Sequence, residues 1–465
     1  MNAKRPNQQL VLPFAAMETG AVRSPTQQGV EAITTPTEPE SPVVSTTTMM
    51  EELCSSENMD RALRKVIANK GAAGVDAMTV YALERHWKQH GPEIMSRLRS
   101  GTYRPAPVKR VEIPKPDGGV RKLGIPTVVD RLIQQALLQV LQPVWEPAFS
   151  QHSHGFRPGR SAQQAVRQAQ VYITEGRSWV VDIDLEKFFD RVNHDILMAR
   201  VARRVTDKRV LHLIRAYLNA GVMENGLVSP STEGTPQGGP LSPLLSNIVL
   251  DDLDKGLEKR GHAFARYADD CNIYVRSETA GRRVMESICD FISRKLKLKV
   301  NESKSAVAKP EKRKFLGFTF KGKKATVLIS EKAKARFKDR IRELTKRGRS
   351  ATQIIEELNP YLRGWVGYFG ACGAYWDLRD LDSWLRRRMR ALTWRAWRLP
   401  RKRFRELTRR GVDWRTAIRM VRYHKNPWHA SQSIALSNAL PDRLWHDKLG
   451  LQSLLQSWHA MRTQP

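Results

Sequence analysis

Two adjacent carboxylates, Asp269 and Asp270, separate two short, mostly apolar segments, Phe264–Tyr267 and Cys271–Val275. Segments of this length and composition predict β-strands, and the polar break between them predicts a hairpin with both acids at its tip. Two negative charges crowded at one tip repel each other unless cations compensate them. This pattern therefore predicts a divalent-metal site.

A third acid, Asp184, comes directly after the apolar segment Trp179–Ile183, which predicts a buried strand. Helical patterns follow from His194 onward and over Ala280–Leu296. This order predicts an α+β fold with the acids on one side of an antiparallel sheet. Three converging carboxylates can hold two magnesium ions for an in-line phosphoryl displacement, so the pattern indicates a nucleotidyl transferase.

An Asp-Asp pair alone is weak support for a metal site, because aspartates favour turns and such pairs occur by chance. The chain contains a second pair, Asp251 and Asp252, in a segment that predicts a solvated helix. The pair Asp269 and Asp270 differs because strands flank it and Asp184 lies upstream.

The chain carries 79 Lys and Arg against 47 Asp and Glu, a formal charge of +32 over 465 residues. An excess of this size indicates a polyanionic partner. Nucleic acid is favoured over a membrane, because no apolar run approaches the roughly 18 residues of a spanning helix. The four cysteines fall singly, so they predict no zinc site and indicate a reducing cytoplasm.

Composition divides the chain into four predicted parts. Residues 1–48 are rich in Thr, Pro, Ser and Gln and predict a flexible leader. Residues 49–325 carry the strands and the acids, and within them Val108–Ile113 and Val120–Ile125 predict a basic hairpin. Residues 326–400 predict long basic helices, and residues 401–465 predict a basic helical extension.

A series of motifs resembles the reverse transcriptases and maturases encoded by bacterial group II introns. In the order of that family, the motifs are Ile113-Pro114-Lys115, Arg121–Pro126, Gly155–Ser161, Asp182-Ile183-Asp184, Thr235–Pro243, Tyr267–Asp270 and Phe315–Phe318. The resemblance implies a right-hand polymerase with fingers, a palm and a helical thumb, followed by a small basic extension that binds DNA. It implies RNA-directed DNA synthesis and assistance to intron splicing and mobility.

By this resemblance, Asp184, Asp269 and Asp270 bind two Mg²⁺ ions, with Mn²⁺ as a substitute, and the backbone carbonyl of Leu185 adds a ligand. The residues implied to bind the deoxynucleoside triphosphate are Lys115, Arg121, Phe189 and Gln237. Phe189 takes the position of a steric gate, whose ring crowds a ribose 2′-hydroxyl. Neighbouring residues near a strand end point oppositely, so one of Phe188 and Phe189 is expected to pack behind the sheet.

Contacts with template, primer or intron RNA are expected from basic and aromatic residues. These are Arg157, Arg160, Lys304, Arg363, Trp365 and Arg387. The segment Tyr361–Phe369 resembles the maturase thumb, and arginines interleaved with tryptophans suit a surface that follows phosphates and stacks on bases. The alternative is that the tryptophans form a core and the arginines solvate its outer face.

No paired Cys and His ligands follow the thumb, so no zinc-containing endonuclease is expected, as in the class C subgroup of these intron proteins. The expected location is the bacterial cytoplasm. Two alternatives remain open. One is a reverse transcriptase of a retron, diversity-generating or defence system, and the other is an RNA-binding splicing factor without catalysis.

Overall fold

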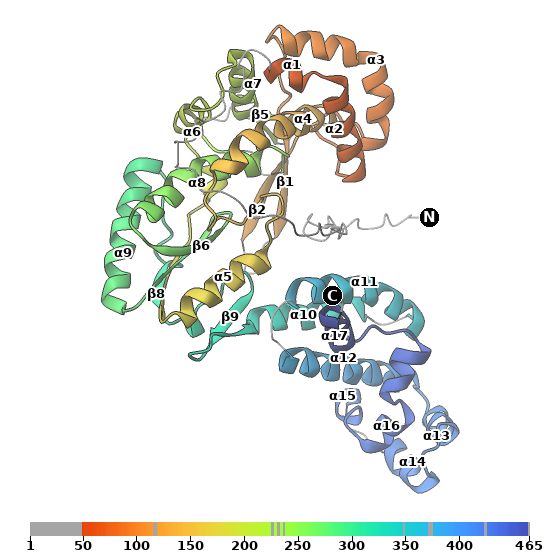
Figure 1. Ribbon diagram of the computed structural model, residues 1–465. Coiled ribbons are helices and arrows are strands. Elements are labelled where there is room, and N and C mark those ends of the chain that lie inside the picture. Colours follow the sequence, from red (N-terminus) through yellow and green to blue (C-terminus); the bar gives the residue numbers. More distant parts are fainter. Residues whose placement is uncertain are drawn as a thin grey trace, which may run out of the picture.

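The computed structural model describes residues 49–114, 119–224, 227–229, 233–235, 238–346, 349–370, 375–422 and 426–463. A region of sheets and helices is followed by a mostly helical region (Figure 1). The predicted leader, residues 1–48, and two predicted nucleotide-binding residues, Lys115 and Gln237, lie outside the described residues. No helix in the described part of the chain has both the length and the apolar character needed to cross a membrane.

The amino-terminal part consists of helices packed beside a sheet of order β2-β1-β4-β5. Strands β1 and β2 form the predicted basic hairpin, with Ile113 opposite Arg121. Helix α4 begins at the cap Thr127, whose hydroxyl accepts a hydrogen bond of 3.1 Å from the N–H of Asp130. The elements are α1 (Met49–Leu53), α2 (Ser56–Ala68), α3 (Val80–Arg99), β1 (Val108–Pro114), β2 (Val120–Ile125), α4 (Val128–Trp145), η1 (Glu146–Ala148), β4 (Val222–Glu224) and β5 (Leu227–Ser229).

The central sheet has the order β6-β7-β3-β8, and each neighbouring pair of strands is antiparallel. In β3, Val181 and Ile183 pack into one apolar cluster and Val180 packs into another, so both faces of the strand are covered. This arrangement explains why the strand is mostly apolar in sequence, and it confirms the predicted α+β palm. The elements are α5 (Ala162–Thr174), β3 (Trp179–Ile183), η2 (Phe188–Asp190), α6 (His194–Val201), α7 (Lys208–Asn219), α8 (Ser242–Lys259), β6 (Ala263–Tyr267), β7 (Asp270–Val275), α9 (Glu278–Phe291), η3 (Ile292–Leu296), β8 (Ala306–Ala308) and η4 (Pro310–Lys312).

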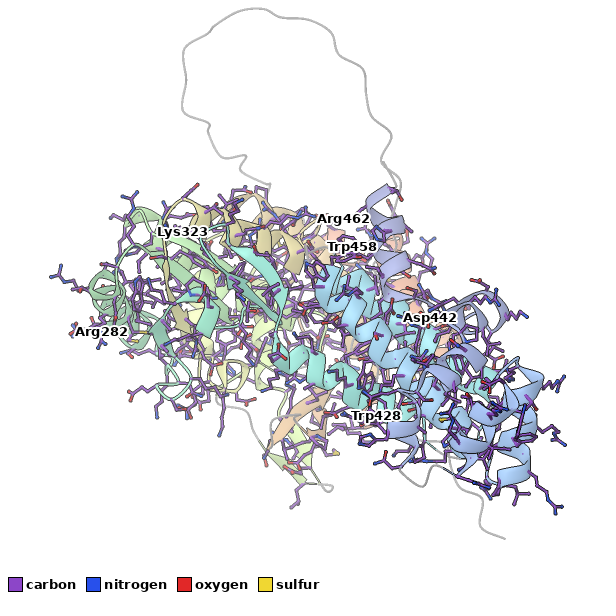
Figure 2. All side chains as sticks on the ribbon, turned by 90° about the horizontal axis from the view of Figure 1, so that it is seen from below. Arg282, Lys323, Trp428, Asp442, Trp458 and Arg462 are labelled. Atoms are coloured by element: carbon purple, nitrogen blue, oxygen red, sulfur yellow. The ribbon has the colours of Figure 1, made fainter. Side chains whose placement is uncertain are left out.

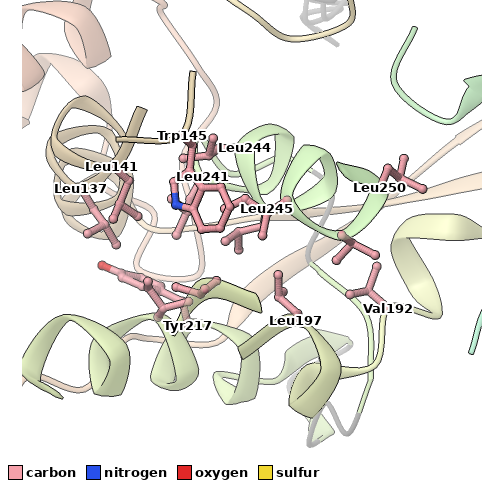
Figure 3. Close-up of a cluster of buried hydrophobic side chains, with 14 of the residues drawn as sticks. Leu137, Leu141, Trp145, Val192, Leu197, Tyr217, Leu241, Leu244, Leu245 and Leu250 are labelled. Atoms are coloured by element: carbon pink, nitrogen blue, oxygen red, sulfur yellow. The ribbon is translucent and has the colours of Figure 1, made fainter. Parts of the chain in front are cut away.

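One apolar core joins the amino-terminal helices to the palm. Figure 3 shows Leu137 and Leu141 of α4 beside Leu241 and Leu245 at the start of α8, with Tyr217 of α7 on the opposite side. Because these side chains come from both parts, fingers and palm are stabilised by the same buried surface.

A hairpin of β9 (Phe318–Lys321) and β10 (Thr326–Ile329) connects the palm to the helical region. In β10, Val327 packs with the palm, whereas Ile329 packs with the helices that follow. Position 325, where the sequence predicts a domain boundary, therefore lies inside this connecting hairpin.

The carboxyl-terminal helices share one core, which includes Trp394, Leu407 and Trp445. The predicted limit between residues 400 and 401 therefore does not separate two cores. The elements are α10 (Glu331–Leu344), α11 (Ala351–Phe369), α12 (Tyr375–Ala396), α13 (Pro400–Arg409), α14 (Trp414–Val421), α15 (Pro427–Ala430), α16 (Ile434–Ala439), η5 (Leu444–Lys448) and α17 (Leu454–Thr463).

Candidate active site

The β3–β7 ladder ends where the predicted acids lie. Its last pair places Ile183 opposite Cys271, so Asp184 and Asp270 are the next residues on two antiparallel strands. Asp269 precedes Asp270 in the turn between β6 and β7. The strand register therefore brings all three acids to the same end of the palm sheet.

The backbone of Asp184 is held on both sides. Its N–H donates to Oγ of Ser305 at 3.0 Å, and its carbonyl accepts a hydrogen bond of 2.8 Å from the N–H of Asn301. Leu185, the predicted carbonyl ligand, is buried beside it. Nζ of Lys304 lies 3.8 Å from Oδ2 of Asp184, so this lysine adjoins the acids.

Asp269 and Asp270 follow Ala268, whose φ of +58° makes the turn tight. Burial raises the pKa of Asp269, and the charge of Asp184 acts in the same direction. Loss of surrounding water raises the pKa of Asp270 to about 7, and Asp269, Asp182 and Asp184 add to this shift. Asp270 lies at an exposed strand end, where the three neighbouring negative charges disfavour its ionised form.

These raised pKa values indicate negative charge that a cation would stabilise. Among the described residues, no three acidic, histidine or cysteine side chains are already arranged as a metal site. The donor set itself fits a hard divalent ion, because carboxylate oxygens are its preferred ligands and each acid disfavours the ionised form of its neighbours. Asp184, Asp269 and Asp270 are therefore the candidate ligands of such an ion.

Asp182 is a fourth acid at this site, and sequence reasoning did not single it out. Nε of Arg313 donates to Oδ2 of Asp182 at 2.8 Å. The signal in the sequence was its position two residues before Asp184, which puts both side chains on the same face of the strand. The ion pair limits the negative charge that Asp182 adds near the site.

Arg121 on β2 lies near enough to the acids that its positive charge lowers the pKa of Asp269, partly offsetting burial. Next to Gln237, Gly238 has a φ of +126°. A side chain at Gly238 would meet the carbonyl oxygen of Gly124 at 2.8 Å, so glycine permits close contact with the basic hairpin.

The two adjacent phenylalanines, Phe188 and Phe189, differ in burial, as expected. Phe188 is 2% exposed and belongs to the main core, whereas Phe189 is half-buried. Their ring centroids lie 5.1 Å apart. The carbonyl of Phe189 accepts a hydrogen bond of 2.6 Å from the N–H of Thr235, which ties the predicted gate to the glycine-rich motif around Gln237.

The sequence predicts that Arg157 contacts RNA, but the residue is only 6% exposed. Its guanidinium pairs with Glu146 at 2.7 Å and donates to the carbonyl of Ser153 at 2.8 Å. It therefore holds its own loop together. Arg160 is half-buried and donates to the side chain of Gln151.

In the helical region, Arg363 is exposed but Trp365 is only 8% exposed. The ring of Trp365 packs 4.6 Å from Phe337 and 4.7 Å from Phe369, between centroids. The prediction that Trp365 contacts RNA is therefore wrong, because its ring is part of the core. Other buried tryptophans here are Trp394, Trp397, Trp445 and Trp458.

Arg387 lies over the half-buried ring of Trp428, 3.9 Å from its centroid, and donates to the carbonyl of Trp428 at 3.1 Å. Figure 2 shows Trp428 at the edge of the helical region. Arg387 and Trp428 are both half-buried, so this stack of a cation on an aromatic ring is only partly exposed at the contact between α12 and α15.

Comparison with known proteins agrees with this geometry. Residues 113–320 match the family model described as reverse transcriptase (RNA-dependent DNA polymerase). Protein YkfC of Escherichia coli (strain K12) is 34% identical over 292 residues, which cover 54% of this chain and 76% of YkfC. The chain belongs to the reverse transcriptase family. Residues 334–411 match the group II intron, maturase-specific domain, so this reverse transcriptase is of the intron-encoded maturase kind.

Group II intron-encoded protein LtrA of Lactococcus lactis subsp. cremoris is 38% identical over 195 residues, which cover 42% of this chain and 32% of LtrA. The match thus spans about a third of LtrA. A chain in the solved "Partial Cas6-RT-Cas1--Cas2 complex" is 25% identical, with a TM-score of 0.35, over 53% of this reverse transcriptase and 42% of that chain. Reverse transcriptases act on nucleic acids and generally use divalent metal ions.

Proposed function

We propose that this reverse transcriptase copies RNA into DNA from deoxynucleoside triphosphates at Asp184, Asp269 and Asp270, with two Mg²⁺ ions and the carbonyl of Leu185 as a further ligand. The supporting observation is the end of the β3–β7 ladder, where strand register brings the acids together. Arg121 adds positive charge beside them.

Bound Mg²⁺ would favour ionisation of the primer 3′-hydroxyl and neutralise the triphosphate. The three carboxylates would hold the ions, while Arg121 and Lys115 would orient the phosphates through charge-assisted hydrogen bonds. Phe189 would exclude a ribose 2′-hydroxyl, and Gln237 would bind the incoming nucleotide. The chain's own contribution is positioning and charge stabilisation.

The same chain would bind its parent intron RNA and assist splicing and mobility in the bacterial cytoplasm. Support comes from the basic helical surface that includes exposed Arg363 and the stack of Arg387 on Trp428. In the carboxyl-terminal helices, the ring of Trp414 is 60% exposed beside Arg415, which suits contacts with DNA. A splicing factor without catalysis is the second candidate, because this surface alone would serve it.

Primer extension on an RNA template separates these candidates. Wild type, Asp269→Ala and the control Asp290→Ala receive deoxynucleotides or ribonucleotides in separate reactions with Mg²⁺. Asp290 is exposed on α9 and pairs with Arg294 at 2.6 Å, and α9 carries none of the proposed metal ligands. We expect DNA synthesis by wild type and the control but not by Asp269→Ala. No synthesis by a folded, RNA-binding wild type would favour the splicing factor.

A further inference from the structure

A fully buried arginine lies beneath the turn that carries Asp269 and Asp270. Arg266, near the end of β6, is 0% exposed. Its ion-pair partner on α8, Asp254, is also 0% exposed. Such a pair is unusual, because removing two charges from water is unfavourable unless every donor finds an acceptor.

All five N–H donors of Arg266 have an acceptor. Nε and Nη2 donate to the two carboxylate oxygens of Asp254, at 2.7 and 2.5 Å. Nη2 also donates to Oγ of Ser153 at 2.7 Å, and Nη1 donates to Oδ1 of Asn247 at 3.0 Å. The fifth donor, on Nη1, reaches the carbonyl of Ala268 at 2.8 Å.

The bond to Ala268 matters most, because Ala268 directly precedes the two acids. Its backbone has a φ of +58°, an unfavourable region for a residue with a Cβ. A hydrogen bond from a fixed, charged donor holds the carbonyl in place and so fixes the direction in which the chain enters Asp269. Guanidinium geometry suits this task, since its donors lie in one rigid plane.

The same network holds the loop that precedes α5. Nδ2 of Asn247 donates to the carbonyl of Gly155 at 2.9 Å. A Cβ at Gly155 would lie 2.2 Å from the backbone N of Ala268, so the loop and the turn are in close contact. The N–H of Arg266 also donates to the carbonyl of His152 at 2.9 Å.

We propose that Arg266, held by Asp254, is a positioning residue that sets the geometry of the metal-binding turn and couples it to the loop of residues 152–155. This proposal rests on the proposed function, because it assigns Arg266 to the placement of Asp269 and Asp270 as metal ligands. Stability alone does not explain the pair, since well-packed apolar residues usually replace a buried ion pair without loss of stability.

The test compares Arg266→Lys with the double variant Arg266→Met/Asp254→Leu. The lysine keeps a positive charge but loses the planar fork. The double variant removes both charges, so neither is left buried without a partner, and we expect it to fold. Its melting temperature should be lower than that of wild type, because Asn247 and the carbonyl of Ala268 lose their donor. Both variants should extend a primer on an RNA template roughly 10- to 100-fold more slowly and need more Mg²⁺ for half-maximal rate.

A second measurement is independent of polymerisation. Titration of free Mn²⁺, followed by electron paramagnetic resonance, should show weaker binding by both variants than by wild type, with Asp269→Ala as the reference for a damaged site. The matched control is Arg200→Met/Asp252→Leu, which removes another arginine–aspartate pair, 2.9 Å apart and on helices α6 and α8. This control should keep the Mn²⁺ affinity and the Mg²⁺ requirement of wild type.

A folded double variant with wild-type rate, Mg²⁺ requirement and Mn²⁺ affinity would overturn the role of Arg266. An equal change in the control would also overturn it, because the effect would then be a general one of ion-pair removal. If wild type itself makes no DNA, the proposed function fails first, whatever the variants do. If the double variant does not fold, the Mn²⁺ affinity of Arg266→Lys decides.

Discussion

The palm turn and the helical carboxyl-terminal region use arginine in opposite ways. In the palm, Arg266 is fully buried and each of its donors has a defined acceptor. In the helical region, Arg387 lies over the half-buried Trp428 and Arg363 is exposed. The buried Arg266 can fix backbone geometry, whereas the exposed Arg363 adds charge to a surface and the half-buried Arg387 lies between these two cases. Chemistry should therefore depend steeply on a few palm residues, and binding should depend weakly on many residues of the helical region.

The largest effect should come from Asp184→Asn. The change removes one carboxylate from the proposed metal site, so single-turnover DNA synthesis should fall by about 10³-fold. RNA affinity, measured by filter binding, should stay within about twofold of wild type, because Asp184 is proposed to bind metal ions and the phosphate contacts come from basic residues elsewhere. Asp290→Asn, an exposed change on α9, is the control. A loss of synthesis below tenfold would argue against the proposed ligand.

Phe189→Ala should have the next largest effect. Removing the proposed gate should raise the incorporation of ribonucleotides relative to deoxynucleotides by roughly 10- to 100-fold. The reason is that the ribose 2′-hydroxyl could then enter the space that the phenyl ring occupies in wild type. Phe188→Leu is the matched control, since Phe188 is 2% exposed in the core. It should lower the free energy of unfolding by about 1 kcal/mol. Unchanged nucleotide selectivity in Phe189→Ala would refute the gate.

In the helical region, Arg363→Ala should weaken RNA binding only several-fold. The slope of log affinity against log salt should fall by about 0.7 to 1 if Arg363 contacts one phosphate. Trp365→Ala sharpens the comparison, because its ring is in the core. It should lower the free energy of unfolding by about 3 kcal/mol and leave the slope unchanged. The reverse pattern would put Trp365, not Arg363, at the RNA surface.

The smallest effect concerns pH. The pKa of Asp270 is raised to about 7, above its ordinary value of 3.8, so between these values the folded state binds the proton more tightly than the unfolded state. Folding stability should therefore fall as pH rises from about 4 to about 7. Because Asp270 is exposed, the expected change is about 1 kcal/mol or less. Melting temperatures in EDTA should show this decline in wild type but not in Asp270→Asn.

Much of the palm was predictable, because local patterns determine it. The strand Trp179–Ile183 and the two strands around Asp269 and Asp270 appear in the structure close to the predicted limits. The prediction of a solvated Asp251-Asp252 pair was wrong. Asp251 is buried and Asp252 pairs with Arg200 at 2.9 Å. Helical periodicity indicates a buried face, but it does not reveal which distant arginines lie opposite that face.

By itself, the sequence determined the acids at strand ends, the order of strands and helices, and the excess of positive charge. These features depend on neighbouring residues and on composition. Tertiary structure alone decided which basic and aromatic side chains turn inward. Trp365 and Arg157 are buried, and Arg266 meets Ser153, a residue 113 positions away in the chain. Such partners are brought together only when the packed helices and the sheet place them within hydrogen-bond distance, and a buried polar group must then find its partners there.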